Sequence, residues 1–278
     1  MPKTEPPNSG APNKASAPES DKPGPPVKAH IREFYDDISR RLEQSRVGNA
    51  VIFLNYGYVS LGSGDESQVD PAGRYLDPTS IRLAFELVGP VDLRGQRVLD
   101  VGCGRGGTAA LLAEQFGADV TGVDLAPEAI SFCRRKHQRP NVHFEVGDAE
   151  NLPAESESFD IVTNIESSHI YPNLPRFYTE VRRVLKASGV FLYTGLLPTH
   201  IWAKTRTEFA ALGLELFGDR NITPNVLASC DAVAARHAKA YGQRDAQLDN
   251  FLATPGSDVY EKMRDGDWEY RILRARRR

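Results

Sequence analysis

Two kinds of apolar pattern alternate through the middle of the chain. Short runs rich in β-branched residues predict buried strands, and longer segments with apolar residues at helical spacing predict helices. The predicted strands are residues 98–101, 118–124, 142–146, 159–162 and 190–194, and the predicted helices among them are residues 107–116, 127–137 and 176–186. Alternating strands and helices predict an α/β fold with a mostly parallel sheet and helices on both faces.

The first part of the chain divides into a polar tail and a helical cap. Residues 1–28 contain eight prolines and scarcely any apolar side chain, so we expect a disordered, proline-rich tail. Helical spacing over residues 29–48 and 78–88 predicts two helices, which make residues 29–90 an N-terminal cap. The polar stretch 62–73 between these helices is a candidate for a flexible gate.

The regular alternation ends near residue 197. Further helices are predicted at residues 202–212, 231–241 and 247–263, and further strands at residues 214–217 and 268–273. The basic run 274–278 is expected to be a solvated chain end.

Composition narrows the classes of function. With 278 residues, 40% of them apolar and 26% charged, the chain can bury one large core, so residues 29–278 are expected to form one domain. The formal net charge of −3 argues against a nucleic-acid partner, because phosphate binding needs a basic face. Apolar runs are too short for stable membrane insertion. Three cysteines without paired spacing fit a reducing, cytoplasmic compartment, and the oligomeric state stays open.

The strongest local signal is a strand that runs into a glycine-rich turn and then a helix. Gly102, Gly104 and Gly107 satisfy the spacing of a dinucleotide-binding loop, and such a turn lets a polar ligand approach bare backbone. Asp124 ends the second strand, where a ribose-binding acid lies in nicotinamide enzymes and in methyltransferases alike. A nicotinamide site, and a packing turn without any ligand, are therefore alternatives at this point.

Two further acidic residues help to distinguish a methyltransferase site from a nicotinamide site. Asp100 precedes the turn, and Asp148 follows the third strand, where its carboxylate can accept a hydrogen bond from an adenine amino group. Three acids at three consecutive strand ends favour a nucleoside with a sulfonium group over a pyrophosphate.

These motifs together resemble the class I S-adenosylmethionine-dependent methyltransferases. The resemblance rests on Asp100-x-Gly102-x-Gly104-x-Gly106, Asp124, Gly147-Asp148-Ala149 and the segments 159–162 and 181–189. It implies a Rossmann-like, seven-stranded sheet with a cofactor-binding core over residues 95–195, an antiparallel hairpin of the last two strands, and a helical lid over residues 224–264. It also implies that S-adenosylmethionine is bound by Asp100, Gly102, Cys103, Gly104, Asp124, Leu125, Asp148, Ala149, Asn164 and Tyr58.

From about residue 50 to the end, the chain looks especially like O-methyltransferases of bacterial polyketide and glycolipid pathways, including the phthiotriol and phenolphthiotriol enzymes. This narrower resemblance implies a hydroxyl on a bulky, apolar natural product as acceptor. His169 lies in the loop after the fourth strand, and a largely neutral imidazole can accept the hydroxyl proton, so His169 is the predicted general base. Glu166 is a candidate for orienting His169, for binding the cofactor ammonium or for capping the loop.

One departure from related sugar O-methyltransferases concerns the fifth strand. Those enzymes carry an acid after it, whereas this chain has Thr194-Gly195, so no metal site is expected. Two other functions stay open, namely methylation of carbon or nitrogen on a small molecule, and a non-catalytic S-adenosylmethionine-binding partner protein.

Overall fold

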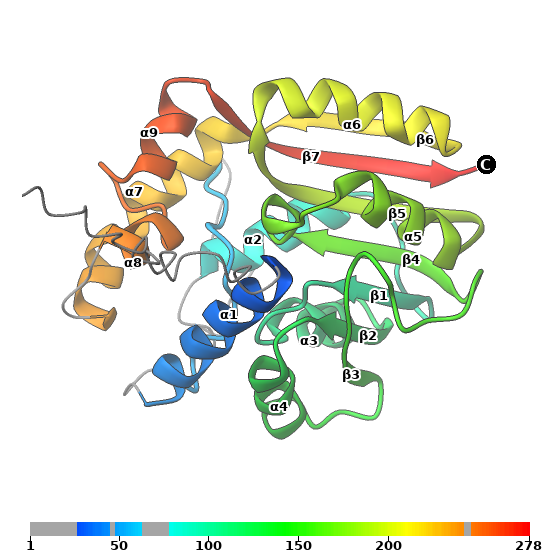
Figure 1. Cartoon of the computed structure of the whole chain (residues 1–278), viewed down its shortest axis with the longest axis horizontal. Coiled ribbons are helices and arrows are strands. Elements are labelled where there is room, and N and C mark those ends of the chain that lie inside the picture. The colour runs from blue at the N-terminus through cyan, green and yellow to red at the C-terminus, as the bar shows by residue number, and fades with distance from the viewer. Residues whose placement is uncertain (1–26, 45–47, 63–77, 242–245) are drawn as a thin grey trace, which may run out of the picture.

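The computed structural model describes residues 27–44, 48–62, 78–241 and 246–278. The predicted tail, apart from its last two residues, and most of the candidate gate 62–73 lie outside the described residues. The strands of the described part form one seven-stranded sheet with the order β3-β2-β1-β4-β5-β7-β6 (Figure 1). They are β1 (Arg97–Val101), β2 (Asp119–Asp124), β3 (Val142–Val146), β4 (Phe159–Ile165), β5 (Leu185–Pro198), β6 (Leu214–Asn221) and β7 (Trp268–Arg277).

The sheet is mixed, with one antiparallel strand. Strands β1 to β5 pair in parallel, and β7 lies antiparallel between β5 and β6. This arrangement confirms the predicted class I methyltransferase fold and the antiparallel pairing of the last two strands.

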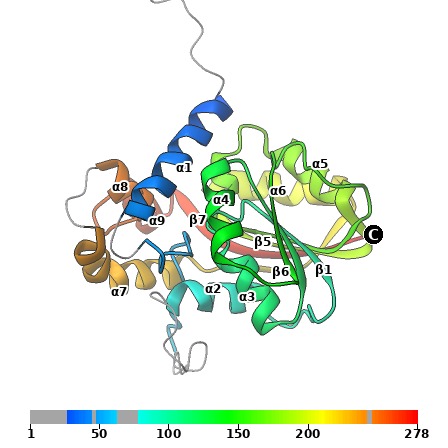
Figure 2. The ribbon, with the colours of Figure 1, turned by 90° about the horizontal axis from the view of Figure 1, so that it is seen from below.

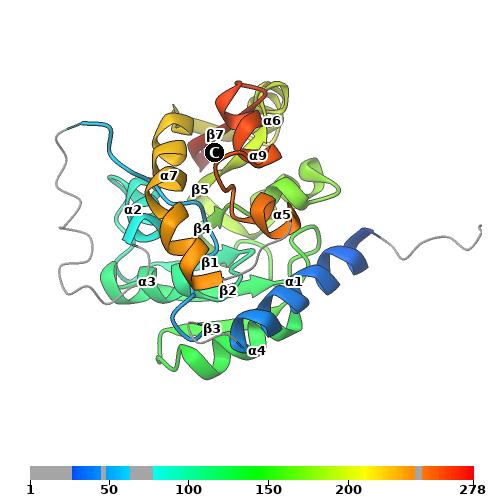
Figure 3. The ribbon, with the colours of Figure 1, turned by 90° about the vertical axis from the view of Figure 1, so that its left-hand side faces the viewer.

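Helices cover both faces and one end of the sheet. They are α1 (Val27–Gln44), α2 (Pro78–Val88), α3 (Gly107–Gln115), α4 (Pro127–Lys136), α5 (Leu174–Val184), α6 (Thr199–Ala211), α7 (Thr223–Tyr241), α8 (Ala246–Phe251) and α9 (Asp258–Arg264), with a short 3₁₀ turn, η2 (Ser168–Ile170). Helices α1, α7, α8 and α9 lie beyond the carboxyl ends of the parallel strands (Figures 2 and 3). These four helices therefore roof the edge of the sheet at which ligands bind in open α/β folds.

Successive side chains of β1 pack into two separate hydrophobic cores on opposite faces of the sheet. Val98 packs into the core that contains residues of α2 and α3, whereas Leu99 packs into the core that contains residues of α5 and α6. Because successive strand side chains point to opposite faces, a strand covered on both faces is apolar throughout. This explains why the β1 run contains few polar residues and why Asp100 within it is conspicuous.

The structure corrects two expectations about the end of the chain. The single helix predicted over 247–263 is divided into α8 and α9, because Pro255 and Gly256 interrupt it. The basic run 274–278 is only partly a solvated end: strand β7 continues to Arg277, and the Arg274 guanidinium donates to the carbonyl of Leu87 at 2.9 Å, whereas Arg276 and Arg278 are exposed.

Candidate active site

The glycine turn between β1 and α3 has a backbone that other residues rarely adopt. Gly102, Gly104 and Gly106 have φ angles of 71°, 52° and 76°. A Cβ atom at Gly106 would lie 2.9 Å from the Cys133 sulfur, so close packing adds to the backbone requirement. Gly107 begins the helix without a positive φ. The glycine spacing that the structure uses is therefore that of the methyltransferase motif.

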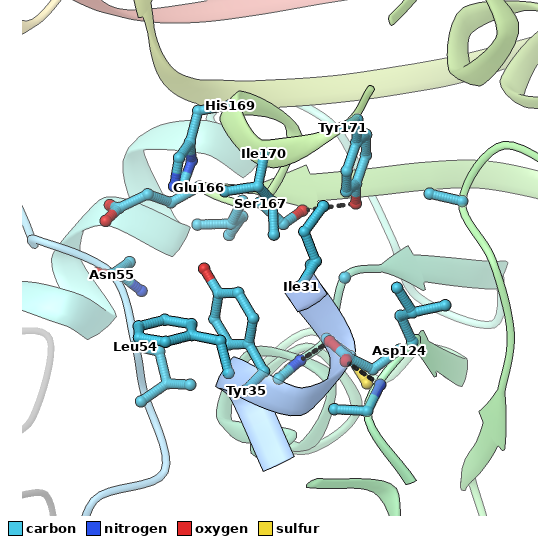
Figure 4. A pocket seen from close by; sticks show the side chains of 18 of the residues that line it. Ile31, Tyr35, Leu54, Asn55, Asp124, Glu166, Ser167, His169, Ile170 and Tyr171 are labelled. Atoms are coloured by element: carbon cyan, nitrogen blue, oxygen red, sulfur yellow. Dashed lines mark hydrogen bonds between the residues drawn. The ribbon is translucent and has the colours of Figure 1, made fainter. Parts of the chain in front are cut away.

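A cavity of about 330 Å³ lies beside this turn, within the size range of small-molecule sites. Its walls come from the turn, from α1, from the extended segment 51–56, from the loop after β4 and from α8. Figure 4 shows side chains of α1 and of the β4 loop pointing into this space from opposite sides. Of the predicted cofactor and catalytic residues, the cavity is lined by Asp100, Gly102, Cys103, Gly104, Asp124, Leu125, Asp148, Ala149 and His169.

Two predicted cofactor residues do not line the cavity. Tyr58 is turned away, with its backbone N–H on the carbonyl of Thr79 and the Arg220 guanidinium 5.6 Å from its ring centre. The left-handed Gly57, with φ of 75°, explains this, because it breaks the alternation of the segment and leaves Tyr56 in the cavity wall.

Asn164 has a bracing position. Its side-chain amide donates to the carbonyl of Val101 at 2.9 Å and to the Ser167 hydroxyl at 2.7 Å. Asn164 therefore ties the end of β4 to the end of β1. It does not line the cavity, but its side-chain oxygen is buried without a hydrogen-bond partner among the described residues, so its contact with the cofactor stays a prediction.

The three acidic residues come together at the carboxyl ends of β1, β2 and β3 but differ in their surroundings. The Asp124 carboxylate accepts from the backbone N–H of Gly104 at 2.8 Å and of Ala126 at 2.9 Å, which fixes its orientation. Asp100 accepts from the Thr163 hydroxyl at 2.7 Å, and burial raises the pKa of Asp100 to about 7. Its second carboxylate oxygen is buried and has no hydrogen-bond partner among the described residues. A buried acceptor of this kind fits a ligand that brings a donor.

Asp148 is engaged by the N-terminal helix. The Lys28 ammonium of α1 lies 2.6 Å from Asp148 and 2.6 Å from Glu150. Sequence reasoning missed this contact, although the apolar face of α1 was recognised. Ile31, Phe34 and Tyr35 of that face line the cavity, so α1 forms part of the site itself.

His169 lies on η2 and faces the cavity (Figure 4). Burial lowers the pKa of His169 to about 4, so the imidazole is neutral at pH 7. Its Nδ1 atom is buried without a hydrogen-bond partner among the described residues. A buried ring nitrogen without a partner is a group whose hydrogen bond a ligand could supply.

Glu166 is the second titratable residue in the loop after β4, three positions before His169. Its carboxylate accepts from the Tyr270 hydroxyl at 2.6 Å and from the backbone N–H of Tyr56 at 2.8 Å. Burial raises the pKa of Glu166 to about 8, and the two hydrogen bonds oppose that change without cancelling it. Of the three roles considered for Glu166, orientation of His169 is not seen, because the hydrogen bonds of its carboxylate come from Tyr270 and Tyr56. In the described part of the chain, no group of three or more His, Cys, Asp or Glu residues is arranged to hold a metal ion.

Comparison with known proteins assigns the family. Residues 99–193 match the family described as "Methyltransferase domain". The chain is also 36% identical over 249 residues to the fatty-acid O-methyltransferase of Mycolicibacterium smegmatis, in an alignment that covers 86% of each protein. With the strand order and the glycine turn described above, the chain belongs to the class I S-adenosylmethionine-dependent methyltransferases.

Two further comparisons describe its neighbours. The phthiotriol/phenolphthiotriol dimycocerosates methyltransferase of Mycobacterium leprae is 34% identical over 233 residues, covering 80% of this chain and 84% of that protein. Among solved structures, the geranyl diphosphate C-methyltransferase of Streptomyces coelicolor A3(2) superposes with a TM-score of 0.67 at 19% identity, covering 92% of this chain and 100% of that one. The structural likeness establishes the shared fold. No helix in the described part of the chain combines the length and the apolar character that crossing a membrane requires.

Proposed function

We propose that the protein transfers a methyl group from S-adenosylmethionine to a hydroxyl group of a bulky, apolar natural product of the polyketide, macrolide or glycolipid type. The observation that carries this proposal is the two-ended cavity. One end has the glycine turn and the acids of the strand ends, and the other has His169 and Glu166 among apolar side chains.

The cofactor end offers the groups that a nucleoside with an amino-acid tail requires. Asp124 is assigned to the ribose hydroxyls and Asp148 to the adenine amino group, with Leu125 and Ala149 beside the base. The free oxygen of Asp100 fits the ammonium of the tail, because a buried carboxylate oxygen without a partner gains most from a charged donor. The cofactor supplies an electrophilic methyl group on a sulfonium sulfur.

The acceptor end is suited to a lipid-like molecule. Ile170, Leu196, Phe251 and Trp268 line the cavity and are assigned to this end; they come from η2, β5, α8 and β7. Burial of apolar surface at about 25 cal/mol per Å² can hold an alkyl chain without any charged contact. The two O-methyltransferase relatives are named for a fatty acid and for phthiotriol lipids, which supports an oxygen acceptor on an apolar molecule.

His169 is assigned to the acceptor hydroxyl. A neutral imidazole with a ring nitrogen that has no partner can form a hydrogen bond with that hydroxyl group and align its oxygen for in-line attack. The α1 helix lies over the cavity and excludes water from the reacting groups.

Carboxyl methylation is a second candidate, because the Mycolicibacterium smegmatis relative is a fatty-acid enzyme. The surroundings of His169 disfavour it, because a buried carboxylate acceptor needs a cation beside it. Lys28 and Arg32, which carry the positive charge along the described cavity wall, both belong to α1 and not to the His169 side.

The test is to incubate the protein with methyl-labelled S-adenosylmethionine and a panel of long-chain secondary alcohols, phenolic lipids and the matching fatty acids. We expect methyl ethers from the alcohols or phenols, and a loss of about 10²-fold or more in kcat for His169→Ala with S-adenosylhomocysteine affinity unchanged. Methyl esters alone, products methylated on carbon or nitrogen, or cofactor binding without any transfer would each contradict the proposal.

A further inference from the structure

Glu166 occupies a backbone conformation that only its surroundings can maintain. Its φ angle is +51°, in the left-handed region that side chains with a Cβ seldom adopt. The backbone N–H of Glu166 donates to the carbonyl of Thr194 at 2.9 Å, which fixes the turn after β4. Strained residues of this kind are concentrated at functional sites. Here the strain directs a carboxyl group into the cavity, where Figure 4 shows it in the same loop as His169.

The Glu166 carboxyl group accepts hydrogen bonds, but no cation among the described residues forms a hydrogen bond or ion pair with it. Tyr270 of β7 and the backbone of Tyr56 donate to one oxygen, and both bonds favour the carboxylate. Burial favours the acid more strongly, so Glu166 holds a proton at pH 7 while the cofactor is absent. The other titratable groups around Glu166 are Lys28, Arg32 and Tyr35 of α1, Tyr56 of the extended segment, Asp100 of β1, Asp124 of β2, His169 of η2, Cys230 of α7 and Tyr270 of β7. Lys28 and Arg32 are the cations of this set. Lys28 is paired with Asp148 and Glu150, and neither cation contributes to the pKa of Glu166.

We propose that Glu166 accepts the proton of the acceptor hydroxyl, and that the positive charge of bound S-adenosylmethionine first converts Glu166 to its carboxylate form. The inference rests on the proposed function, since it needs a sulfonium cofactor in this cavity. It assigns Glu166 as the catalytic residue that receives the proton, while the neutral imidazole of His169 aligns the hydroxyl oxygen by donating a hydrogen bond to it.

The transfer is balanced in charge and in atoms. The hydroxyl oxygen forms the new O–C bond with a lone pair, and the C–S bond breaks with its electron pair kept by sulfur. The O–H bond breaks with its electron pair kept by oxygen, and the proton moves to the Glu166 carboxylate. A cation and an anion thus become a neutral thioether and a neutral carboxylic acid, which suits a cavity of low polarity.

The positive charge of the cofactor is large enough in effect to remove the proton from Glu166. A unit charge about 8 Å away at an effective dielectric constant of about 20 changes the ratio of carboxylate to acid by about ten- to a hundredfold. A group with a pKa of about 8 is about nine-tenths protonated at pH 7. Binding of the cation therefore releases about 0.4 to 0.8 proton per cofactor, by these figures.

The experiment compares S-adenosylmethionine with S-adenosylhomocysteine by calorimetric titration of the full chain at pH 7, in two buffers of different ionisation enthalpy. The two ligands share the nucleoside and the amino-acid tail and differ in the sulfonium charge. We expect S-adenosylmethionine to release several tenths of a proton more than S-adenosylhomocysteine. Its affinity should also rise by up to about tenfold per pH unit below pH 8, with a weaker rise for S-adenosylhomocysteine.

Two variants locate the proton. Glu166→Gln should bind both ligands with equal proton release, and Tyr270→Phe should move the pH midpoint of the extra release upward, because it removes a hydrogen bond to the carboxylate. If Glu166→Gln does not fold, the pH midpoint of the extra proton release in Tyr270→Phe decides whether Glu166 is the source of the proton: an unchanged midpoint would contradict the inference. Equal release of protons by the two ligands in the unsubstituted chain would overturn the inference and leave the methyltransferase proposal intact. Failure of either ligand to bind would overturn the proposed function instead.

Discussion

The Lys28 ammonium lies 2.6 Å from a carboxylate oxygen of Asp148, so the first turns of α1 are tied to the residue assigned to the adenine group. A second ion pair of the same length joins Lys28 to Glu150. Burial lowers the pKa of Lys28, but hydrogen bonds to the two acids outweigh burial, and the net pKa is raised. These two ion pairs join α1 to the loop after β3 at the wall of the cavity.

Replacing Lys28 with Met should weaken S-adenosylhomocysteine binding by about two- to tenfold, mainly through faster dissociation, because partly exposed ion pairs contribute about 0.2–1 kcal/mol each. Stopped-flow displacement at low and high salt measures this, and the difference should shrink at high salt. Arg41→Met is the control, since Arg41 pairs with Asp37 within the same helix. Tighter binding by Lys28→Met would mean that Lys28 competes with the adenine group for Asp148.

Arg105 anchors α1 to the glycine turn from below. Its guanidinium is almost fully buried, and it donates to the Ser39 hydroxyl of α1 at 3.0 Å and to the carbonyls of Val51 at 2.8 Å and Gly48 at 2.7 Å. The guanidinium also lies 3.5 Å from the ring centre of Phe132. Arg105→Lys should lower the free energy of unfolding by about 2–4 kcal/mol, because an ammonium cannot replace the planar fork and leaves buried carbonyls unpaired.

Denaturant titration measures the effect of Arg105→Lys. The matched control is Arg139→Lys, whose partly exposed ion pair with Glu114 should change stability by less than about 0.5 kcal/mol. Equal effects of the two substitutions would mean that the buried hydrogen bonds of Arg105 add nothing to stability.

The stability of the ligand-free protein should depend on pH through Glu166. Its pKa is raised from 4.5 in the unfolded chain to about 8 in the folded protein, so the folded state binds more protons between these values. Its contribution to stability is therefore present in full below pH 4.5 and is lost as pH rises through about 8. From pH 6 to pH 8.5, the unsubstituted protein should lose about 1–3 kcal/mol relative to Glu166→Gln. Urea unfolding at both pH values tests this, and parallel behaviour of the two proteins would contradict it.

Gly107 is the place where the extended segment meets the start of α3. A Cβ atom there would lie 2.6 Å from the carbonyl oxygen of Ile52, although the backbone of Gly107 is otherwise acceptable for alanine. Gly107→Ala should displace the segment 51–56 from the cavity wall and weaken S-adenosylhomocysteine binding by about tenfold, in line with overpacking penalties of about 1–3 kcal/mol. Gly62→Ala is the control, because no described atom lies within 4 Å of its added methyl group. Calorimetry of both variants decides the question.

The parts of the site that the sequence predicted are those fixed by short-range pattern. Asp100 and Asp124 end apolar strands, and the glycines between them follow a spacing that specifies the turn. The boundaries of α2 were predicted to the residue, because Pro78 and Gly89 mark its ends. Such features depend on neighbours in the chain, and the family resemblance added the order of the strands.

The parts that were missed depend on contacts between distant segments. Nothing near Lys28 indicates that Asp148 is its partner, and nothing near Glu166 indicates that Tyr270 donates to it. Tyr56 lines the cavity in place of the predicted Tyr58, because Gly57 is left-handed. A glycine allows this conformation, but its presence in a sequence does not predict it. The signal at Pro255-Gly256, by contrast, was present in the sequence and indicates the break between α8 and α9.

Strand β7 lies between β5 and β6, and it supplies Tyr270 and Trp268 to the cavity region. During synthesis, β6 therefore has no strand to pair with until residues 268–277 have left the ribosome. Until then Glu166 also lacks the tyrosine hydroxyl that holds its carboxylate. Without β7 the edge of β5 has no strand to pair with, so this edge is where a partly synthesised chain exposes backbone that could pair with another chain.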